Sequence, residues 1–116
     1  MLIPTKFDKI FFYRPFIDFR KGVRSLAAIV QDQMGLKPFH KNLFLFCNRK
    51  RDKIKVLFWH GTGFTMVYRL LEENKYHWPK HLENEVLYVD IRKLNIFLQG
   101  LNPWQTAHKD VFYEKT

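Results

Sequence analysis

The chain has 116 residues and a mass of 14.2 kDa, which suits a single domain. Hydrophobic residues make up 47% of the chain and aromatic residues 17%, so a packed core is possible and general disorder is excluded. Five Gly and five Pro exclude collagen-like and low-complexity architecture. No apolar run approaches the roughly 20 residues that span a bilayer, and the start does not resemble a secretory signal, so we expect a cytoplasmic protein without a membrane partner.

Positive charge is concentrated in the first part of the chain. Twenty Lys and Arg against eleven Asp and Glu give a formal net charge of +9. Residues 1–69 hold fourteen of the cations and four of the anions, whereas residues 70–116 hold six cations and seven anions. This asymmetry favours a polyanionic partner over a basic face that only keeps the protein soluble.

The first predicted elements are a strand and a helix. Ile10–Arg14 is a short β-prone run that Pro15 ends. Asp18 is the expected N-cap of the helix, because a carboxylate can accept the unpaired N–H groups of a first turn. Gly35 is the expected left-handed terminator. The apolar stripe of this helix comprises Val23, Leu26, Ala27, Val30 and Met34.

Two strands joined by a polar turn follow. Leu43–Cys47 is apolar on both faces, as a central strand is. Residues 48–53 form the basic tip of a β-hairpin that continues into Ile54–His60. One face of this second strand carries Ile54, Val56 and Phe58, and the other carries Lys55, Leu57 and Trp59.

The rest of the chain predicts two more strands and a second helix. Phe64–Leu71 fits either a strand or a helix, and we choose a strand because it follows a hairpin and is rich in aromatic and β-branched residues. Tyr76–Trp78 is a candidate to pair back, and Val86–Val89 is a short strand. Asp90 is the expected cap of the second helix. Its inward residues are expected to be Ile91, Leu94, Phe97, Leu98 and Leu101, with Gly100 near its end.

These elements predict an α+β fold. We expect a single domain, residues 1–102, with a mostly antiparallel sheet of about five strands and two covering helices. Residues 103–116 are expected to be a C-terminal tail.

Catalytic and metal sites find little support in the residue pattern. Two-metal strand transfer needs clustered carboxylates, but the acidic residues of the basic part are scattered over caps and turns. These residues are Asp8, Asp18, Asp32 and Asp52. His77 and His81 have the spacing of two zinc ligands on a helix, yet Pro79 between them argues against a helix and no Cys completes a set. We therefore expect no enzyme, no metal and no cofactor.

Three other features have structural explanations. Cys47, the only cysteine, cannot form an intramolecular disulfide and is expected to be a buried core residue. Gly61–Gly63 lacks the Lys-Ser/Thr ending of a nucleotide-binding loop and is expected to be a tight turn. His60 is expected to be a partly buried residue at a strand end.

Several stretches, in order, resemble motifs of one protein family. Asp18–Gly22 (D-F-R-K-G), followed by a helix, resembles the family's opening D-M-R-K-G. Leu43–Phe46, residues 53–57 and Trp59–Gly63 resemble its centre, L-F-V-F … D-R-L-K-V-L-x-W-D-G-T-G. Later stretches with counterparts in the family are Arg69–Glu72, Tyr76–Pro79 and Leu98–Leu101. The family is the second-open-reading-frame protein of the insertion sequence sixty-six group, encoded beside the large transposase.

The resemblance implies a small accessory protein of transposition in bacteria, distinct from the DNA-cutting transposase. We expect DNA, including the element ends, and the transposase of the same element as partners. The resemblance brings no catalytic residues. The sequence also differs from the family at His60, where Asp is usual, and at Gln99, where Glu is usual, so acidic chemistry is not carried over to either position.

The basic hairpin tip is the predicted nucleic-acid site, because clustered cations neutralise phosphates and release counterions. The predicted contacts are Arg49, Lys50, Arg51, Lys53 and Lys55, extended by Arg20, Lys21 and Arg24 if the first helix lies beside the hairpin. Trp59 or Tyr68 can stack on a base, although each is more often a core residue. The pattern predicts backbone contact and says little about base specificity.

A second hypothesis is a protein–protein adaptor that docks or assembles the transposase without binding DNA itself. Its anchors would be exposed aromatic residues, because Trp and Tyr dominate interface energetics. The candidates are Trp78, Trp104 and Tyr113.

Overall fold

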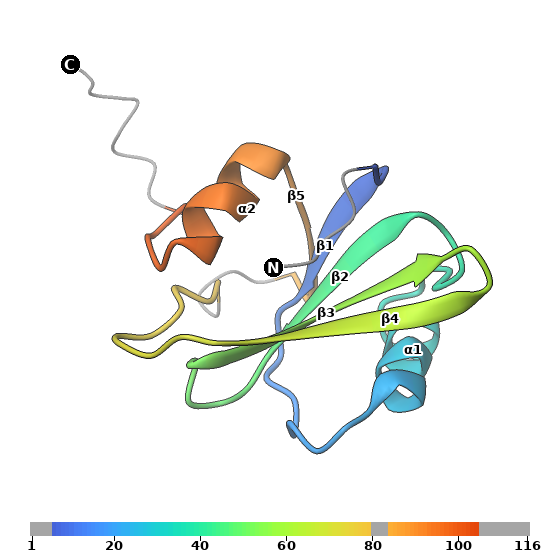
Figure 1. The fold of residues 1–116 in the computed structure, drawn as a ribbon, viewed down its shortest axis with the longest axis horizontal. Helices are drawn as coiled ribbons and strands as arrows, with labels where there is room; N and C mark the ends of the chain where they lie inside the picture. The colour runs from blue at the N-terminus through green and yellow to red at the C-terminus, as the bar shows by residue number, and fades with distance from the viewer. Residues whose placement is uncertain (1–5, 80–83, 105–116) are drawn as a thin grey trace.

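A computed structural model describes residues 6–79 and 84–104. In chain order the elements are β1 (Lys9–Tyr13), α1 (Val23–Asp32), β2 (Asn42–Cys47), β3 (Lys53–His60), β4 (Gly63–Leu70), β5 (Val86–Val89) and α2 (Ile91–Leu98). The strands form one sheet in the order β4-β3-β2-β1-β5 (Figure 1). β1 and β2 are parallel, and the other three neighbouring pairs are antiparallel. The predicted α+β fold with a mostly antiparallel sheet is confirmed.

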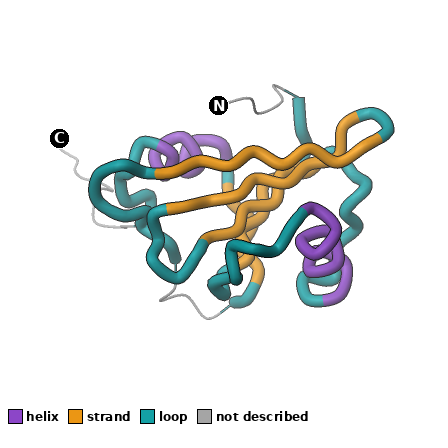
Figure 2. The backbone as a smooth tube through the Cα atoms, turned by 60° about the horizontal axis from the view of Figure 1, so that its bottom comes forward, coloured by secondary structure: helices purple, strands orange, loops and turns teal. Residues whose placement is uncertain are grey.

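The two helices lie on opposite sides of the sheet (Figure 2). On the α2 side, Leu94 and Phe97 pack over inward residues of β1, β2 and β3, such as Phe12 and Val56. On the α1 side, Leu26 and Val30 pack with the opposite-facing residues of the same strands. The alternation predicted for β3 matches this division: Ile54, Val56 and Phe58 belong to the first core and Leu57 to the second.

β2 is the central strand, and Leu43–Cys47 is buried on both faces. Its parallel pairing with β1 sets Phe11 opposite Phe44. Parallel neighbours cannot be joined by a tight turn, so the chain crosses between them through α1. This crossover carries residues 14–22 past the end of β2, where Ile17 forms a parallel bridge with Asn48.

The start of α1 differs from the prediction. Gly22, not Asp18, is the N-cap, and no side chain caps the helix. Asp18 lies four residues too early to reach the first turn, and its carboxylate instead accepts the backbone N–H of Arg20 at 2.9 Å. Gly35 is left-handed, with φ of 68°, as predicted.

The cap of α2 is as predicted, because the Asp90 carboxylate accepts the backbone N–H of Lys93 at 2.8 Å. Leu94 and Phe97 are buried, and Leu98 packs against the same core. Ile91 and Leu101, in contrast, are 47% and 55% exposed. Because the helix has only eight residues, it covers the sheet only with residues near its middle and end, such as Leu94 and Phe97. The positive φ of Gly100 then turns the chain away before Leu101.

Tyr76–Trp78 forms no strand, yet its two aromatic rings complete the core under α2. The ring of Trp78 stacks on Phe12 at 5.0 Å between centroids, and its indole N–H donates to the Arg14 carbonyl. Trp78 is 3% exposed, so its assignment as a surface anchor was wrong. Trp104 is half-buried edge-on to Phe12.

The hairpin between β3 and β4 turns at Gly61 and Thr62, as predicted. Gly61 has φ of 64°, the requirement of a tight two-residue hairpin turn. His60 flanks this turn and is exposed, which differs from the partly buried position predicted.

Cys47 is fully buried, as predicted, and burial raises the pKa of its thiol to about 12. A thiol in the unfolded chain ionises near pH 8.5 or so. The unfolded state therefore loses this proton first, and the stabilisation that Cys47 contributes is present below pH ~8.5 and is lost as the pH rises toward the folded-state value.

We expect the free energy of unfolding to fall more steeply with pH above about 9 in the wild type than in Cys47→Ala, by up to about 1.4 kcal/mol per pH unit. Urea unfolding at several pH values between about 7 and 11 measures the difference. Burial also raises the pKa of Tyr13 and Tyr76, but both tyrosines are present in both proteins and cancel. Equal slopes would contradict the prediction.

Candidate nucleic-acid interface

The hairpin tip, defined here as residues 48–53, is held in one shape by Asn48. The Asn48 side chain accepts the backbone N–H of Lys53 at 3.0 Å and donates to the Asp52 carboxylate at 2.7 Å. The Asn48 carbonyl accepts the backbone N–H of Arg51 at 3.0 Å. The hydrogen bond from Asn48 also lowers the pKa of Asp52. The one carboxylate of the tip is therefore occupied by a neutral amide.

Two of the four cations of the tip lie near aromatic rings from the crossover before α1. The Arg49 guanidinium lies 5.8 Å from the ring centre of Phe16, and the Lys53 ammonium lies 5.9 Å from that of Phe19. Ile17 fixes this segment in place, because its N–H donates to the Cys47 carbonyl at 2.9 Å. Arg49 and Lys50 are exposed, and Arg51 and Lys53 are half-buried.

Lys75 is a further cation of this region that sequence reasoning missed. Its ammonium donates to the Lys50 carbonyl at 2.8 Å. The chain leaving β4 is bonded to the tip at two more points, from Leu71 N–H to the Asp52 carbonyl and from Tyr76 N–H to the Arg51 carbonyl. Only the return of β4 along β3 brings Lys75 here, so nothing in the local sequence indicates it.

Lys55 does not belong to the exposed part of the interface. It is 6% exposed, and its ammonium donates to the backbone carbonyls of Phe19 and Lys21 at 2.7 and 2.8 Å. The ammonium also lies 4.3 Å from the centre of the Phe19 ring. Burial lowers its pKa. Lys55 thus ties the crossover to β3 and is not available to a phosphate.

The three cations predicted from the first helix have different surroundings. Arg20 forms an ion pair with Asp18 and donates to both carboxylate oxygens, which lowers the pKa of Asp18. Both side chains are largely exposed, so this pair adds little to stability. Lys21 and Arg24 are exposed, and the bond from Lys55 to the Lys21 carbonyl holds that end of the segment against β3.

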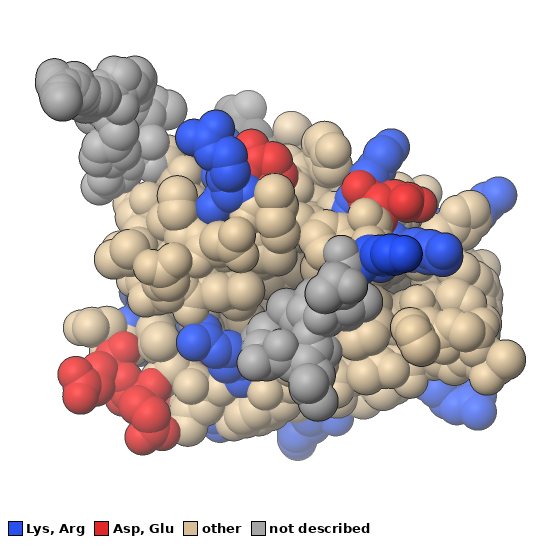
Figure 3. Space-filling model, turned by 45° about the horizontal axis from the view of Figure 1, so that its top comes forward, with Lys and Arg blue, Asp and Glu red and all other residues tan. Residues whose placement is uncertain are grey.

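Charge elsewhere on the protein is more dispersed. On the face shown in Figure 3, Lys and Arg side chains lie in several separate groups instead of one patch. Among pairs of residues that the structure describes, Arg20–Asp18 is the only ion pair. The cations of the tip therefore form no ion pair with a described carboxylate, although Lys53 and Lys75 are near enough to Asp52 to lower its pKa.

The two aromatic residues considered for base stacking lie far apart along β3 and β4. Tyr68 is 51% exposed, pairs with Lys55 across the strands and contacts the Phe19 ring edge-on at 5.3 Å. It is therefore close to the tip. Trp59 lies at the other end of β3.

The described residues hold no cluster of three metal-ligating side chains. His81, one of the two histidines considered as zinc ligands, lies outside the described residues, as do Tyr113 and residues 105–116 of the predicted tail.

Comparison with known proteins places this chain in a family. A model of the family described as IS66 Orf2 like protein matches residues 8–108, which is most of the chain. The chain belongs to the IS66 Orf2-like family. The motif resemblance identified in the sequence is thereby confirmed, and the family is one of accessory proteins of transposition.

Two curated relatives of this IS66 Orf2-like protein come from Sinorhizobium fredii (strain NBRC 101917 / NGR234). The uncharacterized protein y4jC is 23% identical over 111 residues, covering 96% of this chain and 94% of the relative. The uncharacterized protein y4hO is 31% identical over 85 residues, covering 73% of each chain. No solved structure gives a significant match. Neither helix in the described part of the chain is long and apolar enough to cross a membrane.

We expect Lys55→Met to lower the free energy of unfolding by about 1–3 kcal/mol, because the carbonyls of Phe19 and Lys21 lose their donor. Urea unfolding at neutral pH measures the loss. Lys53→Met is the matched control, since Lys53 is on the same face two residues away but its ammonium makes a ring contact at 5.9 Å and a weak attraction to Asp52 in place of two carbonyl bonds. It should cost less than about 1 kcal/mol. Equal costs would show that the two carbonyl bonds are not what makes Lys55 important.

Proposed function

We propose that this protein is a non-catalytic accessory protein of DNA transposition that contacts the nucleic-acid backbone through the hairpin tip. The observation that supports this most directly is a set of cations at the tip that outnumbers its one carboxylate, Asp52, and forms no ion pair within the described chain. Arg49, Lys50, Arg51 and Lys53 lie within one short turn, and Lys75 is bonded to it.

The geometry suits phosphate more than bases. A guanidinium presents a planar fork of donors that matches phosphate oxygens, and a flexible ammonium acts as a point charge. The rings of Phe16 and Phe19 lie 5.8 and 5.9 Å from the Arg49 and Lys53 side chains, and such cation–π contacts at exposed sites are worth only about 0.5–1 kcal/mol each. The tip is a compact turn with no helix or long ribbon to enter a groove, so we expect little base specificity.

The tip is tested by removing Arg49 and Lys50, both exposed and both outside the hydrogen bonds of the Asn48 side chain. We expect Arg49→Ala/Lys50→Ala to weaken duplex binding and to reduce the slope of log affinity against log salt by about 2, as two phosphate contacts are lost. Fluorescence anisotropy with labelled terminal inverted-repeat DNA and with a scrambled duplex, each titrated with salt, measures both quantities.

The matched control is Arg92→Ala/Lys93→Ala, which removes the same two residue types from exposed neighbouring positions on α2. It changes the net charge equally and should leave the salt slope close to the wild-type value. If both pairs weaken binding to the same extent, DNA responds to total charge and the tip has no special role.

A second candidate function, an adaptor for the transposase of the same element, is favoured by β4, whose outer edge pairs with no other strand in the described part of the chain. β4 is an edge strand of eight residues without proline. The N–H of Leu71 donates to the carbonyl of Asp52. In an antiparallel pair such bonds occur at every second residue, so the N–H and C=O groups of the intervening residues of β4 point away from β3. The outward positions are Phe64, Met66, Tyr68 and Leu70. An extended segment of a partner can add to such an edge.

Met66→Pro tests this edge, because it removes an outward N–H in the middle of β4 and leaves the bonds to β3 in place. We expect it to abolish capture of tagged transposase in nuclease-treated extracts, whereas Met66→Leu, which keeps the N–H, should retain capture. Circular dichroism checks that both variants are folded. Capture that is equal for the two variants would argue against docking at β4.

A further inference from the structure

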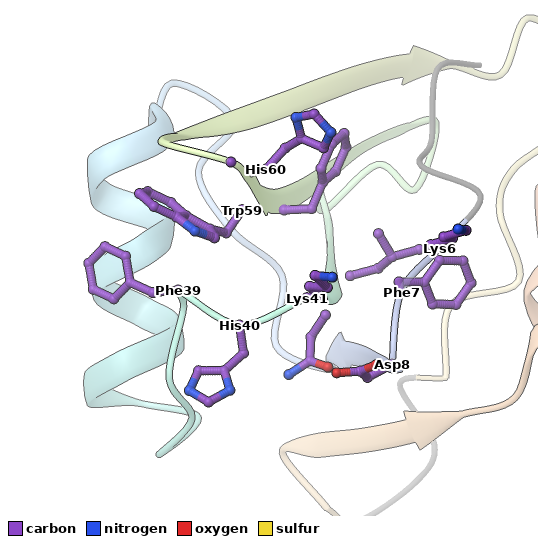
Figure 4. A pocket seen from close by; sticks show the side chains of 12 residues that line it. Lys6, Phe7, Asp8, Phe39, His40, Lys41, Trp59 and His60 are labelled. Atoms are coloured by element: carbon purple, nitrogen blue, oxygen red, sulfur yellow. The ribbon is translucent and has the colours of Figure 1, made fainter.

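A pocket of about 830 Å³ lies at the end of β3 opposite the hairpin tip (Figure 4). Three segments that are distant in the sequence surround it: residues 6–8 before β1, residues 39–43 leading into β2, and residues 58–61 at the end of β3. Its size is that of a site for a small ligand or one unit of a polymer. β3 has eight residues and spans about 23 Å, so the pocket is well separated from the tip.

Two hydrogen bonds join the segments before β1 and β2 that line the pocket. The N–H of Asp8 donates to the carbonyl of Lys41 at 2.6 Å, and the N–H of Lys9 donates to the side-chain oxygen of Asn42 at 3.1 Å. The two segments that enter β1 and β2 are therefore joined just before their strands begin to pair. The pocket is thus built on the parallel part of the sheet.

One wall of the pocket is aromatic. Trp59 contacts Phe39 edge-to-face at 5.1 Å between ring centres and Phe64 at 5.0 Å. Phe39 is 58% exposed, which is unusual for a ring that packs against two others. An edge-to-face contact occupies the edge of one ring and one face of the other, so it leaves the remaining ring faces of the pair open to another partner. This wall therefore offers a flat apolar surface to a planar group.

The remaining lining is polar and mainly basic. Lys6, Lys41, His40 and His60 are exposed and line the pocket. The ammonium groups of Lys6 and Lys41 have no ion pair with any described residue. Asp8 is the one carboxylate in the lining, and its oxygens can accept an N–H from the edge of a base. Aromatic rings beside cations are the combination that binds single-stranded nucleic acids, because bases stack and phosphates pair.

We propose that this pocket binds an unpaired nucleotide of single-stranded DNA, with the base stacked on the Phe39–Trp59 wall and the backbone next to Lys6 and Lys41. A base within a duplex is stacked on its neighbours and cannot present its face to this wall. The pocket therefore distinguishes single strands from duplexes, which the hairpin tip does not. It is a separate site, and it does not depend on the proposed function of the tip.

The test measures anisotropy of a fluorescein-labelled single-stranded oligo(dT) of about twelve nucleotides. We expect Phe39→Ala to weaken its binding about five- to a hundredfold, the loss of one stacked base, and Phe39→Trp to restore it. Because Phe39 is exposed, its truncation should not impair folding. Tyr88→Ala is the matched control, since Tyr88 is an exposed ring, at 67%, that does not line the pocket. Unchanged affinity for Phe39→Ala would overturn the proposal.

Duplex DNA separates this site from the tip. Phe39→Ala should change duplex binding far less than single-strand binding. In a protein that already carries Arg49→Ala/Lys50→Ala, adding Phe39→Ala should weaken single-strand binding by the same factor as in the wild type. Equal losses for single and double strands would overturn the proposal, whether or not the tip binds DNA. If the tip variant has no effect on duplexes but Phe39→Ala weakens single-strand binding, the proposed function of the tip fails and the pocket stands.

A cross-link gives the location without relying on a variant. An oligonucleotide carrying 5-iododeoxyuridine, irradiated in the complex with wild-type protein, should attach to Phe39 or Trp59, as identified by mass spectrometry. Attachment only at residues outside the pocket would overturn the assignment.

Competition by thymidine monophosphate distinguishes a strand from a free nucleotide. The mononucleotide should compete only at concentrations far above those of the oligonucleotide, and competition at similar concentrations would assign the pocket to a free nucleotide instead of a strand.

Discussion

The burial of β2 on both faces is the constraint on which the rest of the structure depends. A strand without a polar face needs cover above and below, and the two helices supply it from opposite sides of the sheet. The parallel pairing with β1 has a second effect, since it requires the long crossover through α1. That crossover brings Phe16 and Phe19 close to Arg49 and Lys53 of the hairpin tip. The core and the candidate interface therefore have a common origin.

Elements with a strong local pattern could be predicted from the sequence. Leu43–Cys47 is apolar throughout and is the central strand, and Asp90 caps α2 because it directly precedes the apolar stripe of that helix. Asp18 failed as a cap because sequence shows which residues can cap but not how far the chain runs before the helix begins. The predicted order of strand, helix and strand is compatible with a parallel pair, but the sequence does not show that β1 pairs with β2 instead of another strand, so only the general class of sheet could be predicted.

The candidate sites were harder to predict because they depend on contacts between distant segments. Alternation along β3 places Lys55 on a definite face, but its burial results from the crossover folding over it. Lys75 reaches the tip only through the return of β4. The pocket at the other end of β3 combines three segments, none of which carries a recognisable motif alone. Charged residues can be recognised in a sequence, but the residues that surround them in the folded protein cannot.

Arg51 has a φ of 63°, a left-handed conformation in which a side chain costs roughly 1 kcal/mol and glycine costs almost nothing. Its N–H and carbonyl both take part in the bonds that shape the turn, so the backbone cannot relax without breaking them. The turn would be easier to form with glycine at this position. Arginine at this position therefore costs the fold stability that glycine would not, and backbone strain of this kind is concentrated at functional sites.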